Sequence, residues 1–141
     1  MTAIRFAEPY DLSRIMTFDS FPGDRIAEIV DRRMLVAEID NVVVGYVAWQ
    51  HRSCLGKDYV NKLNVDDQYR RRGIAQALVS ALNTVLRGRV FISTGVSNAA
   101  ARSLLERTGW TPAGQIVGLL PLDEPTMFFH RNFRSTPLEA E

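Results

Sequence analysis

The stretch from Leu63 to Gln76 combines residue types that suit the binding of a negatively charged group. A strand-like pattern ends near Val65, three arginines follow at positions 70–72, and a helical pattern begins at Gly73. The first turn of a helix carries backbone N–H groups without helical partners, and the helix dipole favours negative charge there. The small residues Gly73 and Ala75 allow an anion to approach these groups. The pattern therefore predicts a phosphate-binding turn to which the arginines add charged donors.

Two familiar nucleotide-binding motifs are excluded for this stretch. It has no Gly-x-x-x-x-Gly-Lys-Ser/Thr sequence of a P-loop and no Gly-x-Gly-x-x-Gly dinucleotide fingerprint. Two alternatives to a phosphate site are a solvated basic turn before a surface helix and a nucleic-acid-binding surface. The net charge of +1 and the lack of an aromatic stacking cluster argue against a nucleic-acid partner.

Few residues outside this stretch offer metal or nucleophilic chemistry. Cys54 is the only cysteine, and His51 and His130 are the only histidines, so the sequence predicts neither an intrachain disulfide nor a metal site. Cys54 could act as a nucleophile, with His51 as its partner. A lone cysteine without a placed base is more often inert, and neighbours on one strand rarely meet in the required geometry.

The elements that must position the arginine-rich stretch alternate between strands and helices. Alternating and β-rich runs predict strands at 3–8, 35–39, 42–49, 59–65, 90–94, 110–119 and 126–133. Helical spacing predicts a helix from 9 broken at 18–23, one around 26–30, one from 73 to a stop at 88, and one from a cap at 97 or 98 to a stop at 109. This order favours an α/β (α+β) fold, with a mixed central sheet of about six to seven strands flanked by about four helices.

The composition is that of one folded domain, expected at 1–134, with a frayed tail at 135–141. Hydrophobic residues make up 46% and charged residues 23%, which excludes extensive disorder. No run approaches the ~18 apolar residues of a membrane span, and the first ten residues lack the apolar segment of a secretory signal. Together with the single cysteine, these features predict a cytoplasmic protein without a membrane partner.

Two motifs in this chain resemble those of the GNAT-type N-acetyltransferases. The segment at 70–75 fits their acetyl-CoA motif, Gln/Arg-x-x-Gly-x-Gly/Ala. Their second segment, Asn-x-x-Ala-x-x-Leu-Tyr-x-x-x-Gly-Phe, is matched by Asn98, Ala101, Leu104, Gly109 and Trp110. The order, spacing and topology agree as well, and the resemblance covers roughly residues 3–133.

The resemblance implies acetyl transfer from acetyl-CoA to a primary amine by direct attack in a ternary complex, without a metal. In this fold the fourth and fifth strands splay apart and acetyl-CoA lies between them. Backbone groups of 63–65 would pair with the pantetheine arm, with the amide of Val65 or a neighbour on the thioester oxygen. Amides from 71 to 76 would hold the pyrophosphate, and the Asn98 side chain would reach the pantetheine, cap its helix, or do both. The expected cofactor-binding residues are Leu63, Asn64, Val65, Arg70, Arg71, Arg72, Gly73, Ile74, Ala75, Gln76 and Asn98.

The resemblance assigns no catalytic acid or base. Leu105 stands where many relatives have a tyrosine that protonates the leaving sulfur, and Ser93 stands where the bacterial ribosomal-protein alanine acetyltransferases have a glutamate. Leucine donates no proton, and serine is a poor base without activation. Other polar side chains are candidates, each with a plain structural alternative: Asp58 and Glu38 as bases, and Tyr46, Tyr59 and Ser103 as donors.

The acceptor and the assembly stay open at this stage. A protein N-terminus, a lysine, a polyamine, an amino acid or a drug would each supply an amine, as a small molecule or a peptide. Phe18, Phe21 and Pro22 fall in the helix connection that lines the acceptor site of similar proteins, or they are packing residues. A homodimer is compatible with the sequence. The alternative function is a catalytically weak or inactive module that binds or senses acyl-CoA.

Overall fold

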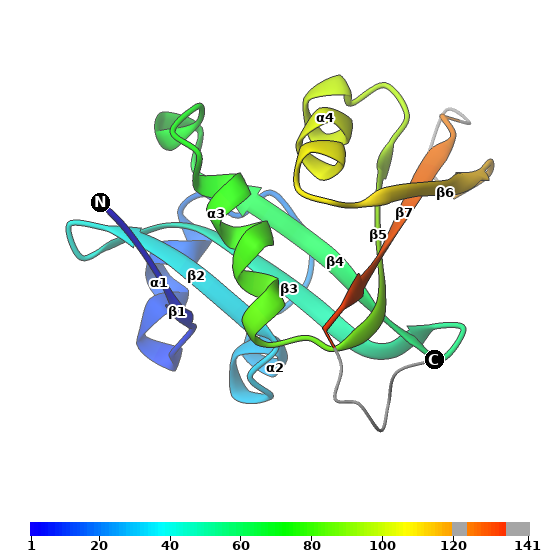
Figure 1. Ribbon diagram of the computed structural model, residues 1–141. Helices are drawn as coiled ribbons and strands as arrows, with labels where there is room; N and C mark the ends of the chain where they lie inside the picture. The colour runs from blue at the N-terminus through cyan, green and yellow to red at the C-terminus, as the bar shows by residue number, and fades with distance from the viewer. Residues whose placement is uncertain (120–123, 135–141) are drawn as a thin grey trace. The chain divides into compact units, whose positions relative to one another are not determined.

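The computed structural model describes residues 1–119 and 124–134 of the 141-residue chain (Figure 1). Its strands are hydrogen-bonded in the order β1-β2-β3-β4-β5-β7-β6, and four α-helices accompany them in the described part of the chain. The expected mixed sheet with four helices is therefore confirmed. The expected tail at 135–141 lies outside the described residues. The chain divides into two compact units, Met1–Gln50 with Asn61–Leu82, and His51–Val60 with Asn83–Glu141.

Unit 1 is built on an antiparallel meander. Its strands are β1 (Thr2–Phe6), β2 (Met34–Ile39), and the parts of β3 (Val42–Cys54) and β4 (Lys57–Val65) that fall within it. The predicted hairpin between β2 and β3 is confirmed, and its turn residues Asp40 and Asn41 have φ values of 51° and 66°. Such values suit the short polar side chains of Asp and Asn.

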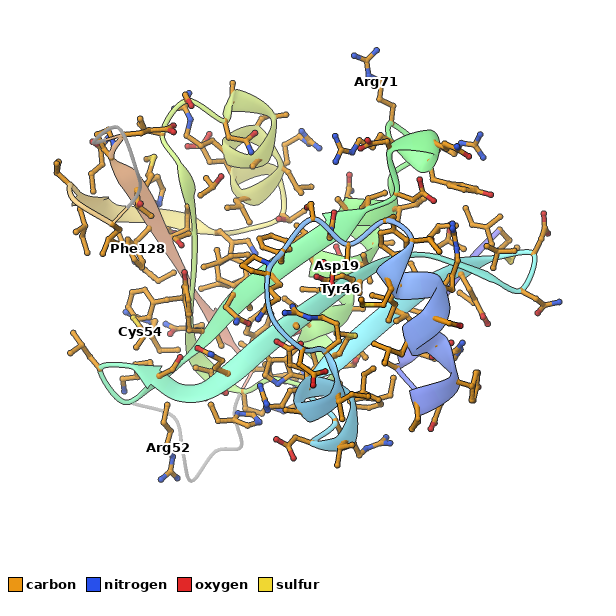
Figure 2. The ribbon with its side chains drawn as sticks, turned by 180° about the vertical axis from the view of Figure 1, so that it is seen from behind. Asp19, Tyr46, Arg52, Cys54, Arg71 and Phe128 are labelled. Carbon is orange, nitrogen blue, oxygen red and sulfur yellow. The ribbon has the colours of Figure 1, made fainter. Side chains whose placement is uncertain are left out.

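Three helices pack on the strands of unit 1. They are α1 (Leu12–Met16), α2 (Ile26–Val30) and α3 (Ile74–Ala81). Figures 1 and 2 show α3 on one face of the strands and α1 and α2 on the other. The α1 and α2 face encloses a buried cluster that includes Ile15, Ile29, Met34, Val36 and Tyr46, which follows from the apolar spacing of these segments.

Gly45 explains how closely α3 packs on β3. A Cβ atom at this position would lie 3.0 Å from the carbonyl oxygen of Asn64 and 3.3 Å from both Ile74 Cγ2 and Leu78 Cδ1. Only glycine leaves room for the neighbouring backbone and the helix at these distances. The close approach fixes the first turns of α3 against the end of β4 within unit 1.

Unit 2 contains the first part of β4, together with β5 (Gly88–Gly95), β6 (Thr111–Ile116), β7 (Thr126–Phe133) and the helix α4 (Ala99–Arg107). β4 runs parallel to β5 from Asp58↔Val90 to Val60↔Ile92, and β7 is antiparallel to both β5 and β6. Trp110 is buried and meets Phe133 edge-on, with ring centroids 5.7 Å apart.

Several element boundaries differ from the sequence prediction by a few residues, and three of the differences have a clear physical reason. β3 continues to Cys54, whereas the sequence predicted an end at Trp49. The pattern missed this extension because the exposed polar residues at 50–53 show no apolar alternation. The helix expected from 73 to 88 ends at Ala81 and is followed by a 3-10 turn over Leu82–Thr84, where Asn83 and Thr84 are weak helix formers. The residues Pro9–Asp11 form a 3-10 turn before α1.

Candidate functional site

The N-terminus of α3 is open. Gly73 occupies the N-cap position with φ 76° and ψ 13°, and none of the described side chains caps the helix. The first helical hydrogen bond runs from the amide of Ala77 to the carbonyl of Gly73, at 3.0 Å. The amides of Ile74, Ala75 and Gln76 therefore have no acceptor among the residues that the structure describes. This is the arrangement of donors expected of an anion site.

The three arginines before α3 surround this end with positive charge. All three are exposed, and Figure 2 shows Arg71 projecting from the loop into open space. Arg70 pairs with Asp67 at 2.8 Å, and the guanidinium of Arg72 lies 5.1 Å from the ring centre of Tyr69. Arg71 has a φ of 64°, so the turn places two residues, Arg71 and Gly73, in the left-handed region.

Asp66 holds the loop at the end of β4. Its carboxylate accepts the amide of Gln68 at 3.1 Å and pairs with Arg14 of α1 at 2.6 Å. Its own amide donates to the carbonyl of Val44 at 2.8 Å. The hydrogen bond from Gln68 lowers the pKa of Asp66 below its ordinary value, and the positive charge of Arg14 acts in the same direction. The carboxylate therefore stays charged at neutral pH.

The expected cofactor-binding residues divide between the two units. Those at 63–65 and 70–76 all lie in unit 1. They follow the end of β4, the loop at residues 67–73 (the arginine loop) and the start of α3. Asn98 lies in unit 2, where its side-chain oxygen accepts the amide of Ala101 at 3.1 Å. The capping role of Asn98 is therefore confirmed, and its contact with pantetheine stays a prediction. The side chain of Asn64 is buried and donates to Asp19 at 3.3 Å.

Tyr59 and Ser93 form a hydroxyl pair in unit 2. Their oxygens are 2.6 Å apart, and the ring of Phe128 stacks on Tyr59 with centroids at 6.3 Å. Ser93 is thus hydrogen-bonded to Tyr59, a pairing that the sequence does not indicate. Leu105, at the other altered position, is buried with 2% exposure.

Most other candidate acids, bases and nucleophiles are already paired within their units. Asp58 lies 3.1 Å from the His51 ring, Glu38 pairs with Arg5 at 3.2 Å, and Ser103 accepts from Arg107 at 3.0 Å. His51 is therefore engaged with a carboxylate, and nothing in unit 2 pairs it with Cys54, whose thiol is free.

Tyr46 is fully buried and donates to Asp19 at 2.6 Å. Burial raises the pKa of Tyr46 well above its ordinary value, and the neighbouring Asp19 carboxylate adds to this effect. Tyr46 therefore stays protonated at neutral pH and acts as a fixed hydrogen-bond donor. Figure 2 shows it beneath the connection between α1 and α2, with Asp19 next to it.

A buried group of charged side chains on the same face of unit 1 escaped sequence reasoning. Arg25 is 2% exposed and lies 3.5 Å from both Asp19 and Glu28, while Lys62 donates to Glu28 at 2.6 Å. Arg25 Nε and Nη1 and Glu28 Oε1 have no hydrogen-bond partner among the described residues. Nothing in the pattern signals this burial, because charged residues next to a Pro-Gly break normally face solvent.

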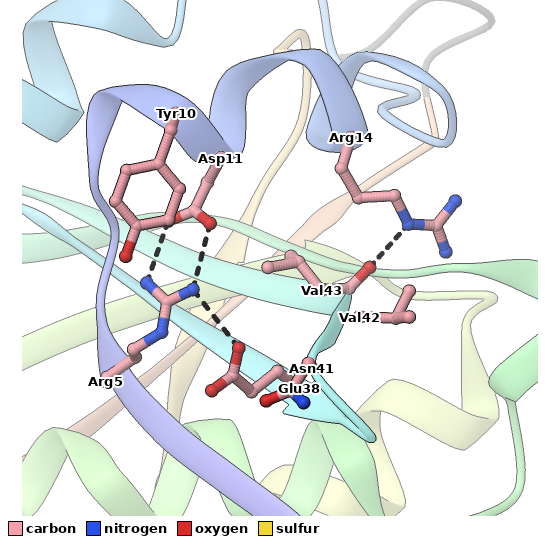
Figure 3. A pocket seen from close by; sticks show the side chains of 8 residues that line it. All are labelled: Arg5, Tyr10, Asp11, Arg14, Glu38, Asn41, Val42 and Val43. Atoms are coloured by element: carbon pink, nitrogen blue, oxygen red, sulfur yellow. Dashed lines mark hydrogen bonds and ion pairs between the residues drawn. The ribbon is translucent and has the colours of Figure 1, made fainter.

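An open pocket of about 550 Å³ lies elsewhere in unit 1 (Figure 3). Arg5 donates two hydrogen bonds to Asp11, of 2.8 and 2.9 Å, and a third to Glu38. Burial would raise the pKa of Asp11, but the hydrogen bonds from Arg5 and from the Glu8 amide outweigh it and lower the pKa. The charges of the pocket thus neutralise one another, and none of the expected cofactor-binding residues lines it.

Two further observations on the described part of the chain concern metal binding and membranes. Residues 1–119 and 124–134 contain no group of three or more His, Cys, Asp or Glu side chains that could hold a metal ion. None of the helices described there is long and apolar enough to cross a membrane.

Comparison with known structures identifies the fold. A crystal structure of a GNAT-family acetyltransferase from Bacillus cereus superimposes with a TM-score of 0.86 at 22% identity, covering 96% of this chain and 99% of that one. The ribosomal-protein-S18-alanine N-acetyltransferase of Escherichia coli gives 0.80 at 19% identity, covering 100% and 99%. A structure from Salmonella typhimurium, solved with its cofactor acetyl-CoA, gives 0.77 at 17% identity, covering 96% of each chain.

Sequence comparison identifies the family. The model of the acetyltransferase (GNAT) family matches residues 4–110, which include the strand end, the arginine loop, α3 and α4. The sequence matches no curated protein. The chain therefore belongs to the acetyltransferase (GNAT) family.

Proposed function

We propose that this GNAT acetyltransferase transfers an acetyl group from acetyl-CoA to a primary amine by direct attack within a ternary complex. The observation that carries the proposal is the open N-terminus of α3. Its unpaired amides at 74–76 and the arginines before them match a family motif in type and spacing. The neighbour solved with acetyl-CoA supports the choice of donor.

The donor would be held mainly by backbone groups of unit 1. In this proposal the amides from Arg71 to Gln76 bind the pyrophosphate, where the helix end and the arginines supply positive potential. The backbone of Leu63–Val65 pairs with the pantetheine arm as a neighbouring strand would. Asn98 adds a contact through its side-chain nitrogen, because its oxygen already caps α4.

The chemistry requires a neutral amine and a stable leaving group. An alkyl ammonium has a pKa of about 10.4, so the acceptor must lose a proton before its nitrogen attacks the carbonyl carbon. The amide of Val65 would stabilise the oxyanion that forms. The carbon–sulfur bond then breaks and the thiolate leaves. A thiol pKa of about 8.5 makes this departure possible without a strong acid, which suits a buried leucine at position 105.

In this proposal the Tyr59–Ser93 hydroxyl pair relays the amine proton, directly or through water, to bulk solvent. The pair is half-buried and internally hydrogen-bonded at 2.6 Å, and the resemblance places Ser93 where some relatives have a glutamate. A Tyr59→Phe variant keeps the stacking on Phe128 and removes the hydroxyl. We expect a turnover loss of about 10²-fold if this hydroxyl acts in proton transfer.

The second candidate function is an acyl-CoA-binding module without catalysis, which the residues at 93 and 105 favour. Thiol release from acetyl-CoA, measured with a panel of amines, separates the two. Amine-dependent release with one acetylated product per thiol supports the enzyme. Calorimetric binding of CoA without release for any amine contradicts it and supports the module.

A further inference from the structure

All three guanidinium nitrogens of Arg14, in α1, donate hydrogen bonds within unit 1. Its Nε donates to the carbonyl of Val43 at 2.8 Å, its Nη1 to Thr17 at 2.8 Å, and its Nη2 to Asp66 at 2.6 Å. The guanidinium also lies 5.3 Å from the ring centre of Phe18. A side chain held at so many points defines the position of whatever it touches.

Asp66 passes this constraint to the arginine loop. It accepts the amide of Gln68 with its side chain and the amide of Tyr69 with its carbonyl, at 3.1 and 2.8 Å. Beyond Tyr69 the contacts found in the described chain are local: Arg70 pairs with Asp67, and Arg72 lies over Tyr69. Asp66 is therefore the last residue before α3 whose side chain ties the loop to another element.

The helix that follows has an anchor of its own. Ile74 and Leu78 pack against β3 at Gly45, so α3 stays in place without help from the loop. The two anchors lie on either side of residues 67–73. If the anchor at Asp66 is lost, the loop can shift while the helix and the sheet remain ordered.

We propose that Arg14 is a positioning residue for the CoA-binding turn and that it acts through Asp66. This inference rests on the proposed function, because it assumes that the turn binds the pyrophosphate of CoA. The Arg14–Asp66 pair orders the loop before the ligand arrives, so binding does not have to supply that ordering. Arg14 itself does not contact the ligand in this arrangement.

Unit 1 offers a matched control for the general stabilising effect of such an arginine. Arg33 also donates to a carbonyl of β3, that of Trp49 at 2.8 Å, and also pairs with an aspartate, Asp31 at 3.1 Å. It therefore loses the same kinds of contact as Arg14 when replaced by methionine. No described contact links Arg33 to residues 66–73.

The experiment compares CoA affinity by calorimetry for the wild type, Arg14→Met and Arg33→Met. We expect Arg14→Met to raise the Kd by about tenfold to a hundredfold, the range of a charge-assisted hydrogen bond, and Arg33→Met to stay within about twofold. Arg14→Lys keeps the charge but loses the fork of donors, so its Kd is expected between the two. Asp66→Asn, nearly isosteric, serves if Arg14→Met does not fold, and it is expected to weaken CoA binding in the same direction.

A kinetic readout separates positioning from a purely structural role. With S-acetylpantetheine, which lacks the pyrophosphate, kcat/KM is expected to be unchanged in Arg14→Met, whereas the KM for acetyl-CoA rises. Equal losses with both donors would overturn the proposal, as would an equal loss in Arg33→Met. Unchanged CoA affinity in folded Arg14→Met and Asp66→Asn would overturn it while leaving the proposed function intact. A wild-type protein without affinity for CoA would overturn both.

Discussion

At the start of α4 the protein supplies its own hydrogen-bond acceptors, whereas none of the described residues supplies one at the start of α3. Asn98 caps α4 by accepting the amide of Ala101 at 3.1 Å. Glu124 accepts the amide of Ser97 at 2.9 Å and also the hydroxyl of that residue. The turn before α4 is thus filled by a carboxylate of the chain itself, while the turn before α3 is lined with arginines and left open.

The two helix starts show that the N-terminus of a helix can serve either the stability of the protein or the binding of a ligand. In both helices the first backbone N–H groups have no acceptor within the helix itself, and the N-terminal end of the helix dipole is positive. In unit 2 the Asn98 side chain accepts the amide of Ala101 and the carbonyl of Ser97 accepts the amide of Ala99, while Glu124 accepts the Ser97 amide just before the helix. A glycine at the N-cap, φ 76°, offers no side chain in unit 1, so the donors remain for a ligand.

The largest effect is expected from a substitution that blocks the open N-terminus of α3. Gly73→Glu places a side chain and a negative charge where the pyrophosphate is expected, so CoA affinity should fall by more than about a hundredfold, as loss of several charge-assisted hydrogen bonds implies. Calorimetry with CoA measures it.

Gly88→Glu is the matched control for Gly73→Glu. Gly88 has a φ of +74° against +76° for Gly73, and a Cβ at either position meets nothing within 4 Å. The backbone strain of the two variants should therefore be equal, at about 1–2 kcal/mol. Similar CoA affinities for the two folded variants would contradict the assignment of the site.

Removal of one arginine should weaken the open end without abolishing it. Arg71→Ala is expected to cost about 1.5 kcal/mol of CoA binding, roughly tenfold, because the backbone amides remain. Arg70→Ala should cost less, since that side chain is already engaged with Asp67. Titration at two salt concentrations checks this, because the effect of a solvated charge should shrink at higher salt. An Arg71→Ala loss as large as that of Gly73→Glu would mean that the amides contribute little.

Removal of the cap should affect stability at the closed end. Asn98→Ala is expected to lower the free energy of unfolding by about 1 kcal/mol, whereas Asn98→Asp keeps an oxygen acceptor and should retain most of the stability. Urea unfolding of both variants measures this. If Asn98→Asp keeps its stability but raises the KM for acetyl-CoA, the amide nitrogen has the proposed contact with pantetheine. An Asn98→Ala protein as stable as the wild type would show that the cap contributes nothing.

The smallest effect concerns the carboxylate that fills the turn before α4. Hydrogen bonds from the Ser97 hydroxyl and amide lower the pKa of Glu124 from its ordinary 4.5. A lowered pKa stabilises the fold above pH 4.5, and this contribution is lost as the pH falls through the folded-state value. The stability difference between the wild type and Glu124→Gln should therefore be constant near neutral pH and vanish in acid. Unfolding curves at several pH values test it, and a difference that grows in acid would contradict this sign.

The fold was largely predictable because its signals are local. Apolar alternation predicted the strands, and the spacing of Ile74, Leu78 and Leu82 predicted the helix after the arginine loop. Glycine at 73 and a capping residue at 97 or 98 predicted the two helix starts. The errors fell where local signals fade, as in β3 beyond Trp49, whose exposed polar residues are held by backbone pairing.

The site was only partly predictable because much of it depends on contacts between distant residues. The motif predicted the open turn, but nothing near Asp66 in the sequence indicates Arg14, which lies 52 residues away. Burial of Arg25 among carboxylates, and the pairing of Tyr59 with Ser93 across 34 residues, likewise appear only in the folded chain. Charged and hydroxyl side chains have no periodicity that would reveal such partners.

The most direct test of the open-turn assignment is an NMR titration that follows backbone amides during addition of CoA and, separately, of pantetheine. The difference between the two ligands isolates the nucleotide part of CoA, including its pyrophosphate. We expect large chemical-shift differences between the two ligands at Ile74, Ala75 and Gln76, and negligible ones at 99–101, where the Asn98 side chain already caps the helix. Unchanged chemical shifts of the amides at 74–76 at saturating CoA would contradict the assignment of the open turn. Ligand-dependent differences concentrated at 99–101 would contradict it as well.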